Sequence, residues 1–129
     1  MDGNREMLKR YEDALNELRE KLVKELKGGV KSIIVYGSVA RGEATEESDV
    51  DIMVVLEEHS LYKRVSDIVY EVDLKNRTAT SIFWATPEEL FKYAKNGSPF
   101  LESVAEEGVV LYDDGTFAGV RQSILGKDG

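Results

Sequence analysis

The stretches VYGSVARG at residues 35–42 and SDVDIMVVL at residues 48–56 decide how this chain folds. Each contains a short run of β-branched and apolar residues, which is the composition of a buried β-strand. We therefore expect strands at residues 32–36 and 49–56. The polar residues between them, about a dozen, are too few for a helical crossover, so the two strands should be antiparallel neighbours.

Two aspartates open the second predicted strand. Because side chains alternate along a strand, Asp49 and Asp51 should point to the same side, with Cα atoms about 6–7 Å apart, whereas Val50 and Ile52 point into the core. No lysine or arginine is adjacent in sequence to pair with the carboxylates. Taken alone, the two acids could be ordinary surface residues, but together they repel each other and favour a bound divalent cation.

The first predicted strand ends at Gly37 and Ser38. Glycine allows the backbone to turn sharply and to approach a ligand closely. The amides that follow, in a helical turn, can donate to phosphate oxygens, and the Ser38 hydroxyl adds another donor. Arg41 is equally compatible with a phosphate contact and with a surface ion pair. If the two strands are neighbours, a triphosphate on this turn would face a Mg²⁺ ion on the aspartates.

The whole string GSVARGEATEESDVDIMVVL, residues 37–56, resembles the signature of the minimal nucleotidyltransferase branch of the DNA polymerase β-like nucleotidyltransferase superfamily. The resemblance implies an α/β (α+β) fold in which helices pack on a small mixed sheet of about four strands. It also implies Mg²⁺-dependent transfer of a nucleoside monophosphate, AMP from ATP, to an acceptor. By this resemblance Asp49 and Asp51 would be the catalytic metal ligands. The nucleotide-binding residues would be Gly37, Ser38 and Arg41.

The same resemblance implies a partner protein. Relatives of this size are often encoded with a small helical protein of the HEPN type, and some act as antitoxins that attach AMP to that partner. Active members carry a third carboxylate on a later strand, but the matching residues 78–85 (TATSIFWA) contain no acid. Asp73, the poorer candidate Glu71, another group or a partner would have to replace it. The alternative is a degenerate domain that binds a nucleotide or a partner without catalysing transfer.

Length and composition agree with a single domain over residues 1–129 that has a frayed tail at residues 126–129. The net charge of −8 argues against generic nucleic-acid binding, which depends on lysine and arginine. The absence of cysteine excludes disulfides and thiolate metal sites, which leaves mainly carboxylate oxygens as metal ligands. The polar N-terminus and the lack of a long apolar stretch lead us to expect a cytoplasmic protein.

Periodicity and capping signals predict the remaining elements. An amphipathic helix is expected over residues 4–27, and a second helix should follow Ser60, which could cap it. The run TPEE at residues 86–89 is a capping box that opens a helix ending near Lys95. The last predicted elements are a helix from Ser98 to Gly108, a strand at residues 109–112 and a helix carrying Phe117, Val120 and Ile124.

Three further side chains are open to more than one interpretation. Phe83 and Trp84 are interpreted as strand packing rather than as platforms for a nucleotide base. His59 is interpreted as a loop residue or a helix cap. None of the three is expected to take part in the chemistry.

Overall fold

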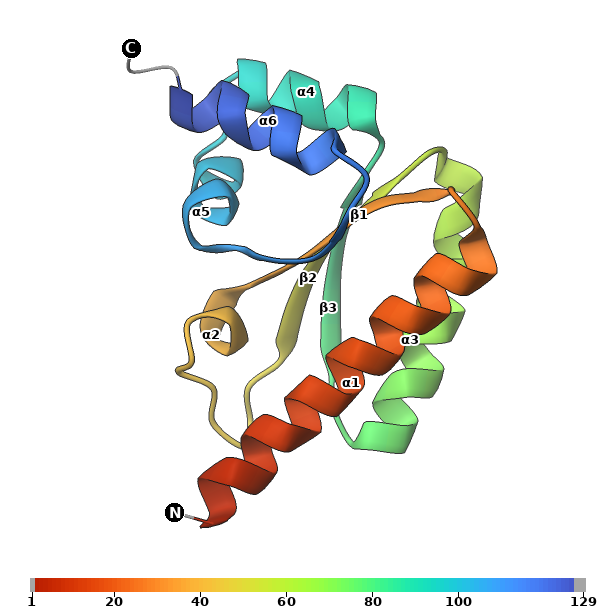
Figure 1. Ribbon diagram of the computed structural model, residues 1–129, viewed down its shortest axis with the longest axis vertical. Helices are drawn as coiled ribbons and strands as arrows, with labels where there is room; N and C mark the ends of the chain where they lie inside the picture. The colour runs from red at the N-terminus through yellow and green to blue at the C-terminus, as the bar shows by residue number, and fades with distance from the viewer. Residues whose placement is uncertain (1, 127–129) are drawn as a thin grey trace.

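The centre of the molecule is a four-stranded sheet in the order β3-β2-β1-β4 (Figure 1). The computed structural model describes residues 2–126, and the side chains from residue 9 onward. The strands are β1 (Val30–Tyr36), β2 (Val50–Leu56), β3 (Thr80–Ala85) and β4 (Val109–Asp113). β1 is antiparallel to both β2 and β4, and β2 is parallel to β3. The predicted α/β fold with a small mixed sheet is confirmed, as is the antiparallel pairing of the first two strands.

Helices cover both faces of this sheet (Figure 1). On one face, α1 (Asp2–Leu26) packs beside α3 (Tyr62–Asn76). On the other face, α4 (Pro87–Lys95), α5 (Pro99–Glu107) and α6 (Thr116–Leu125) contact one another. Two short elements complete the described chain: the single helical turn α2 (Gly37–Ala40) and the 3₁₀ turn η1 (His59–Leu61).

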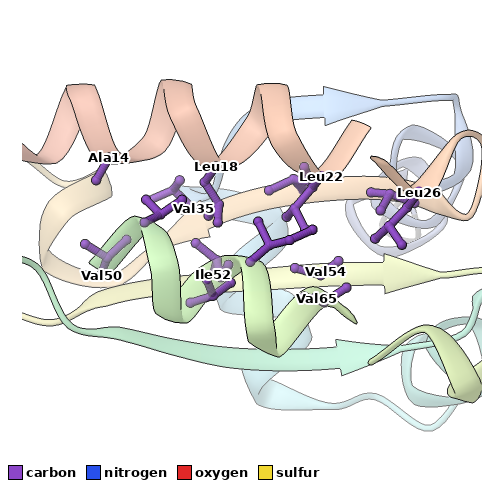
Figure 2. Close-up of a cluster of buried hydrophobic side chains, with 14 of the residues drawn as sticks. Ala14, Leu18, Leu22, Leu26, Val35, Val50, Ile52, Val54 and Val65 are labelled. Carbon is purple, nitrogen blue, oxygen red and sulfur yellow. The ribbon is translucent and has the colours of Figure 1, made fainter. Parts of the chain in front are cut away.

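An apolar core joins α1 and α3 to the sheet (Figure 2). Leu18 and Leu22 of α1 come from the predicted stripe, and Leu22 is completely buried. Burying one such side chain contributes roughly 1.5–3 kcal/mol, so this stripe fixes α1 across the strands. The labelled residues that share this core are Ala14, Leu18, Leu22, Leu26, Val35, Val50, Ile52, Val54 and Val65.

A second core fills the space between the sheet and α4, α5 and α6. Ile34 and Met53 point into it, whereas their chain neighbours Val35 and Ile52 point into the first core. Both faces of β1 and β2 are therefore buried, which explains why these strands are nearly continuous apolar runs in the sequence.

The capping box before α4 is confirmed. The Glu89 amide donates to Thr86 Oγ1 at 3.3 Å, and the Thr86 amide donates to Glu89 Oε1 at 3.0 Å. The helix predicted from Ser98 is also confirmed, since the Leu101 amide donates to Ser98 Oγ at 3.2 Å.

The prediction that Ser60 caps a helix is wrong. Ser60 lies inside η1 and is exposed, and α3 is preceded by Leu61, which makes no side-chain cap. Because η1 leads directly into α3, the Leu61 backbone already has helical dihedrals of −78° and −14°. A side-chain cap needs an extended backbone at that point.

Two predictions about the whole chain, the frayed tail and the lack of a membrane span, can be compared only with residues 2–126. Of the predicted frayed tail, residues 127–129 lie outside the described residues. Within residues 2–126 no helix combines the length and the apolar character of a membrane span.

The two capping assignments can be separated by a matched pair of variants. Thr86→Ala removes a cap and should lower the free energy of unfolding by about 1 kcal/mol. Ser60→Ala removes an uninvolved hydroxyl and should change it by less than about 0.5 kcal/mol. Urea denaturation followed by circular dichroism measures both values, and equal losses would contradict the assignment.

Candidate active site

The candidate site lies where β1 ends and β2 begins. The antiparallel register pairs Tyr36 with Asp51, so the turn after Tyr36 lies beside this carboxylate. Gly37 has φ +76°, a conformation that side-chain-bearing residues rarely adopt. A Cβ atom at Gly37 would overlap Asp51 Oδ2 and lie 3.2 Å from Asp51 Cγ. Glycine is therefore required here both for the backbone angle and for the close approach of the turn to Asp51.

Asp51 lies in β2, whereas Asp49 directly precedes the strand, and its charge acts on Asp51. Val50 and Ile52 are buried, whereas Asp49 is exposed and Asp51 is half-buried. Burial raises the pKa of the Asp51 carboxyl, and the negative charge of Asp49 raises that pKa further. The Arg41 charge opposes both effects and lowers it. Two carboxylates in this environment would gain from a divalent cation that neutralises them.

The donor set of this pair suits a hard cation. Carboxylate oxygens are the ligands that Mg²⁺ uses in proteins, where it keeps several waters and also binds substrate phosphates. Among the described residues no group of three or more acidic, histidine or cysteine side chains could enclose a metal alone. Asp49 and Asp51 would therefore share the ion with waters or with oxygens from a ligand.

The helical turn α2 begins at Gly37, directly beside the carboxylates. Its preceding residue, Tyr36, gives it no side-chain cap. The first amides of a helical turn have no partner within the turn, so they are open to a ligand. The amides that close the turn are already engaged: Arg41 N donates to Gly37 O, and Glu43 N donates to Ser38 O. The turn thus presents its first amides and the half-buried Ser38 next to Asp51.

The loop between α2 and β2 is fixed from outside by Tyr11, which in the sequence is visible only as part of an apolar stripe. This side chain is 2% exposed. Its hydroxyl lies 2.7 Å from the Thr45 carbonyl oxygen and 3.0 Å from the Ser48 carbonyl oxygen, so one proton serves both acceptors. Tyr11 thereby connects α1 to the loop segment that precedes Asp49. The one signal for this role was a tyrosine in a stripe made mostly of leucine.

Arg41 is engaged in ion pairs in this structure. Its Nε lies 2.6 Å from Glu43 Oε1, and its Nη1 lies 3.4 Å from Glu107 Oε2. All three side chains are largely exposed, so these pairs contribute little to stability. Glu107 comes from α5, and no sequence pattern linked it to this loop. The alternative phosphate contact of Arg41 stays a prediction.

The strand beside β2 carries no acid at this site. Ser81 of β3 is the register partner of Asp51 and is exposed. Asp73 is engaged elsewhere: it accepts hydrogen bonds from the Thr78 hydroxyl at 2.7 Å and from the Thr80 amide at 3.0 Å. These bonds fix the turn from α3 into β3. Glu71 is exposed on α3, where its Oε2 lies 4.0 Å from Nζ of Lys21 on α1.

An aromatic hollow adjoins the site on the same face of the sheet as Asp51. Its volume is about 360 Å³, and we call it the aromatic pocket. Burial and the Asp51 charge both raise the pKa of Tyr36, one of its lining residues. Trp84, as predicted, is a packing residue, since its ring stacks on that of Tyr62 with the ring centroids 4.7 Å apart. The pocket is lined by Tyr36, Phe83, Tyr93, Ser98, Phe100 and Leu101.

A glycine–serine turn beside paired aspartates, on antiparallel strands of a mixed sheet, defines the nucleotidyltransferase class. The comparison of sequences agrees, because the model of the nucleotidyltransferase domain family matches residues 15–112. The chain belongs to this family and is a nucleotidyltransferase.

Its similarity to one relative extends over most of the chain, and its similarity to another is confined to about a third of it. A candidate protein adenylyltransferase of Methanocaldococcus jannaschii is 40% identical over 101 residues, which are 78% of this chain and 97% of the relative. The protein adenylyltransferase MntA of Thermococcus cleftensis is 55% identical over 42 residues, which are 33% of this chain and 36% of the relative.

Two solved structures share the fold. One is a crystal structure of a toxin–antitoxin with AMP-PNP, with a TM-score of 0.60 and 13% identity over 88% of this chain and 86% of the other. The second, a toxin–antitoxin MntA-HpeT mutant, has a TM-score of 0.53 and 13% identity over 84% of this chain and 81% of the other.

The close approach of Gly37 to Asp51 can be tested against a glycine with the same backbone angle. Gly97 has φ +73° and no atom within 4 Å of the place a Cβ would take, so Gly97→Ala should cost about 1–2 kcal/mol of stability from backbone strain alone. Gly37→Ala adds the displacement of the Asp51 carboxylate and should cost at least about 1 kcal/mol more. Thermal and urea unfolding measure both variants. Equal costs would show that the Asp51 carboxyl moves aside without loss of stability and would contradict the predicted extra cost.

Proposed function

We propose that this nucleotidyltransferase transfers AMP from ATP to a hydroxyl group of a partner protein, in a reaction that depends on Mg²⁺. The observation that carries the proposal is the contact between the Gly37 turn and Asp51, because it puts a phosphate-binding backbone beside a metal-binding carboxylate. The names of two relatives, which describe protein adenylyltransferases, support AMP as the transferred group and a protein as its acceptor.

Each site residue has a distinct proposed role. Asp49 and Asp51 hold Mg²⁺, and the turn at Gly37 and Ser38 binds the triphosphate through amides and the serine hydroxyl. Mg²⁺, when bound, stabilises the charge that develops on the attacking and leaving oxygens. Arg41 lies near enough to Asp51 to lower the pKa of the Asp51 carboxyl. Because the ion pairs of Arg41 are exposed and weak, replacing them with a phosphate contact requires little free energy.

The proposed step is a single displacement at the α-phosphorus of ATP. The acceptor hydroxyl oxygen forms a bond to the α-phosphorus, and the bond from that phosphorus to the bridging oxygen breaks. Pyrophosphate leaves with the electron pair. Because Ser81 occupies the register position beside Asp51 and Asp73 is engaged in a turn, the hydroxyl proton passes to solvent or to a side chain of the partner.

The acceptor is proposed to be a small helical partner of the HEPN type. Residues 2–126 form one sheet with a core on each face, and we propose that they act as one domain whose acceptor comes from another chain. One solved structure of the same fold is a toxin–antitoxin with AMP-PNP, which is consistent with a partner and an adenine nucleotide. An antitoxin role follows if the attached AMP inactivates the partner.

Label transfer tests this proposal directly. The chain is co-purified with a HEPN-type partner and incubated with ATP labelled in its α-phosphate, and label on the partner is followed after denaturing electrophoresis. Label should appear only with Mg²⁺, and Asp51→Asn should slow its appearance by at least about a hundredfold, since charge stabilisation by the metal is worth several kcal/mol.

The matched control is Asp67→Asn. Asp67 is an exposed carboxylate of α3 that forms an ion pair with Lys63 of the same helix, so this variant should keep the wild-type rate. ATP labelled in its γ-phosphate should transfer no label. Transfer of the γ-label, or full activity in Asp51→Asn, would refute adenylyl transfer at this site.

A further inference from the structure

The aromatic pocket is joined to the candidate active site through the strand register. Tyr36, which lines it, is the partner of Asp51 on β1. Phe83 pairs with Met53, which is two residues beyond Asp51 on β2 and therefore on the same face of the sheet. The pocket thus begins opposite Asp51, at Tyr36, and reaches the level of Met53, one two-residue strand step or roughly 6–7 Å further along the sheet.

The rings around the pocket contact one another at steep angles. The ring centroids of Phe100 and Tyr36 lie 5.2 Å apart with an interplanar angle of 82°, and those of Phe100 and Phe83 lie 4.8 Å apart at 55°. The ring centroids of Phe83 and Tyr93 lie 6.2 Å apart, with an interplanar angle of 56°. None of these three contacts is a parallel stacked pair, so none of them covers two ring faces at once. Part of the aromatic surface is left open, because Phe100 and Tyr93 remain partly exposed.

Two of these rings are partly open to solvent in spite of their apolar character. Phe100 is 37% exposed and Tyr93 is 42% exposed. The Ser98 hydroxyl, a polar group of the lining, already accepts the Leu101 amide at the start of α5. Apolar surface that stays open beside a charged site is a common property of ligand pockets. The lining favours a flat, apolar-faced group over a phosphate or a sugar.

We propose that the aromatic pocket binds the purine base of the nucleotide by stacking. This inference rests on the proposed function, because it takes the triphosphate to be held at Gly37 and Asp51. The base is tethered to the α-phosphate through the ribose, so it must bind close to Asp51, and the pocket begins at Tyr36, the register partner of Asp51. Phe83 therefore belongs to the binding surface as well as to the strand packing that the sequence indicated.

A comparison of two ligands tests the pocket separately from the phosphate site. Mg²⁺-ATP and Mg²⁺-tripolyphosphate are titrated into the wild type and into Phe100→Ala by calorimetry. Loss of the ring should weaken ATP about tenfold, equal to about 1.4 kcal/mol, which is within the usual range for stacking on a base. Binding of tripolyphosphate, which has no base, should be unchanged.

Two further variants control this experiment. Phe91→Ala removes a phenylalanine of α4 that is 48% exposed and does not line the pocket, so ATP binding should stay at the wild-type value. Phe100→Leu keeps most of the apolar volume without the flat ring. It should weaken ATP binding while retaining the wild-type melting temperature.

The outcomes distinguish the two proposals. If the wild type binds both ligands and the Phe100 variants bind ATP normally, the base does not occupy the pocket, although the phosphate site stands. Normal ATP binding together with a loss of AMP transfer in these variants would instead assign the pocket to the acceptor and overturn the inference. If neither ligand binds to the folded wild type, the proposed function fails together with the pocket.

Discussion

The antiparallel pairing of β1 with β2 is the constraint on which the site depends. It puts Tyr36 opposite Asp51, so the chain must turn away from the sheet directly above a carboxylate. Glycine suits that turn, because the backbone has a positive φ and a Cβ at Gly37 would displace the Asp51 carboxyl. A shift of one residue in this register would send both aspartates to the face that α1 covers, where an unpaired charge is too costly to bury.

Packing on the two faces of the sheet protects this register. Val50 and Ile52 are held in the core beneath α1 and α3, while Met53 and Val55 are held beneath the helices of the opposite face. Each residue of β2 after Asp51 is therefore buried on one face or the other. Tyr11 extends the same support to the loop before β2, since its hydroxyl contacts two carbonyl oxygens there. The candidate site thus lies at the partly exposed start of β2, whereas the rest of the strand is buried.

The surroundings of Asp51 differ from those implied by the wider family. Ser81 lies beside it where a third carboxylate is expected, and Asp73 instead stabilises the turn into β3. An enzyme with two carboxylates can still hold a metal and a triphosphate, but it gives up an internal base for the acceptor. That loss is tolerable when the acceptor belongs to a partner held in place, because positioning and charge stabilisation supply most of the catalysis in phosphoryl-type transfers.

The sequence by itself determined the strands, the spacing from Gly37 to Asp51, the side of the strand on which Asp51 lies, and the family. These features are local, because the side-chain period of a strand and the conformational freedom of glycine act over a few residues. Only the tertiary structure decided that Ser81 lies opposite Asp51, that Asp73 is occupied, that Glu107 reaches Arg41 and that Ser60 caps nothing. The aromatic pocket likewise joins residues of β1, β3, α4 and α5, which no local pattern connects. Such contacts depend on strand register and helix packing, which are set by burial of the whole core rather than by any one segment.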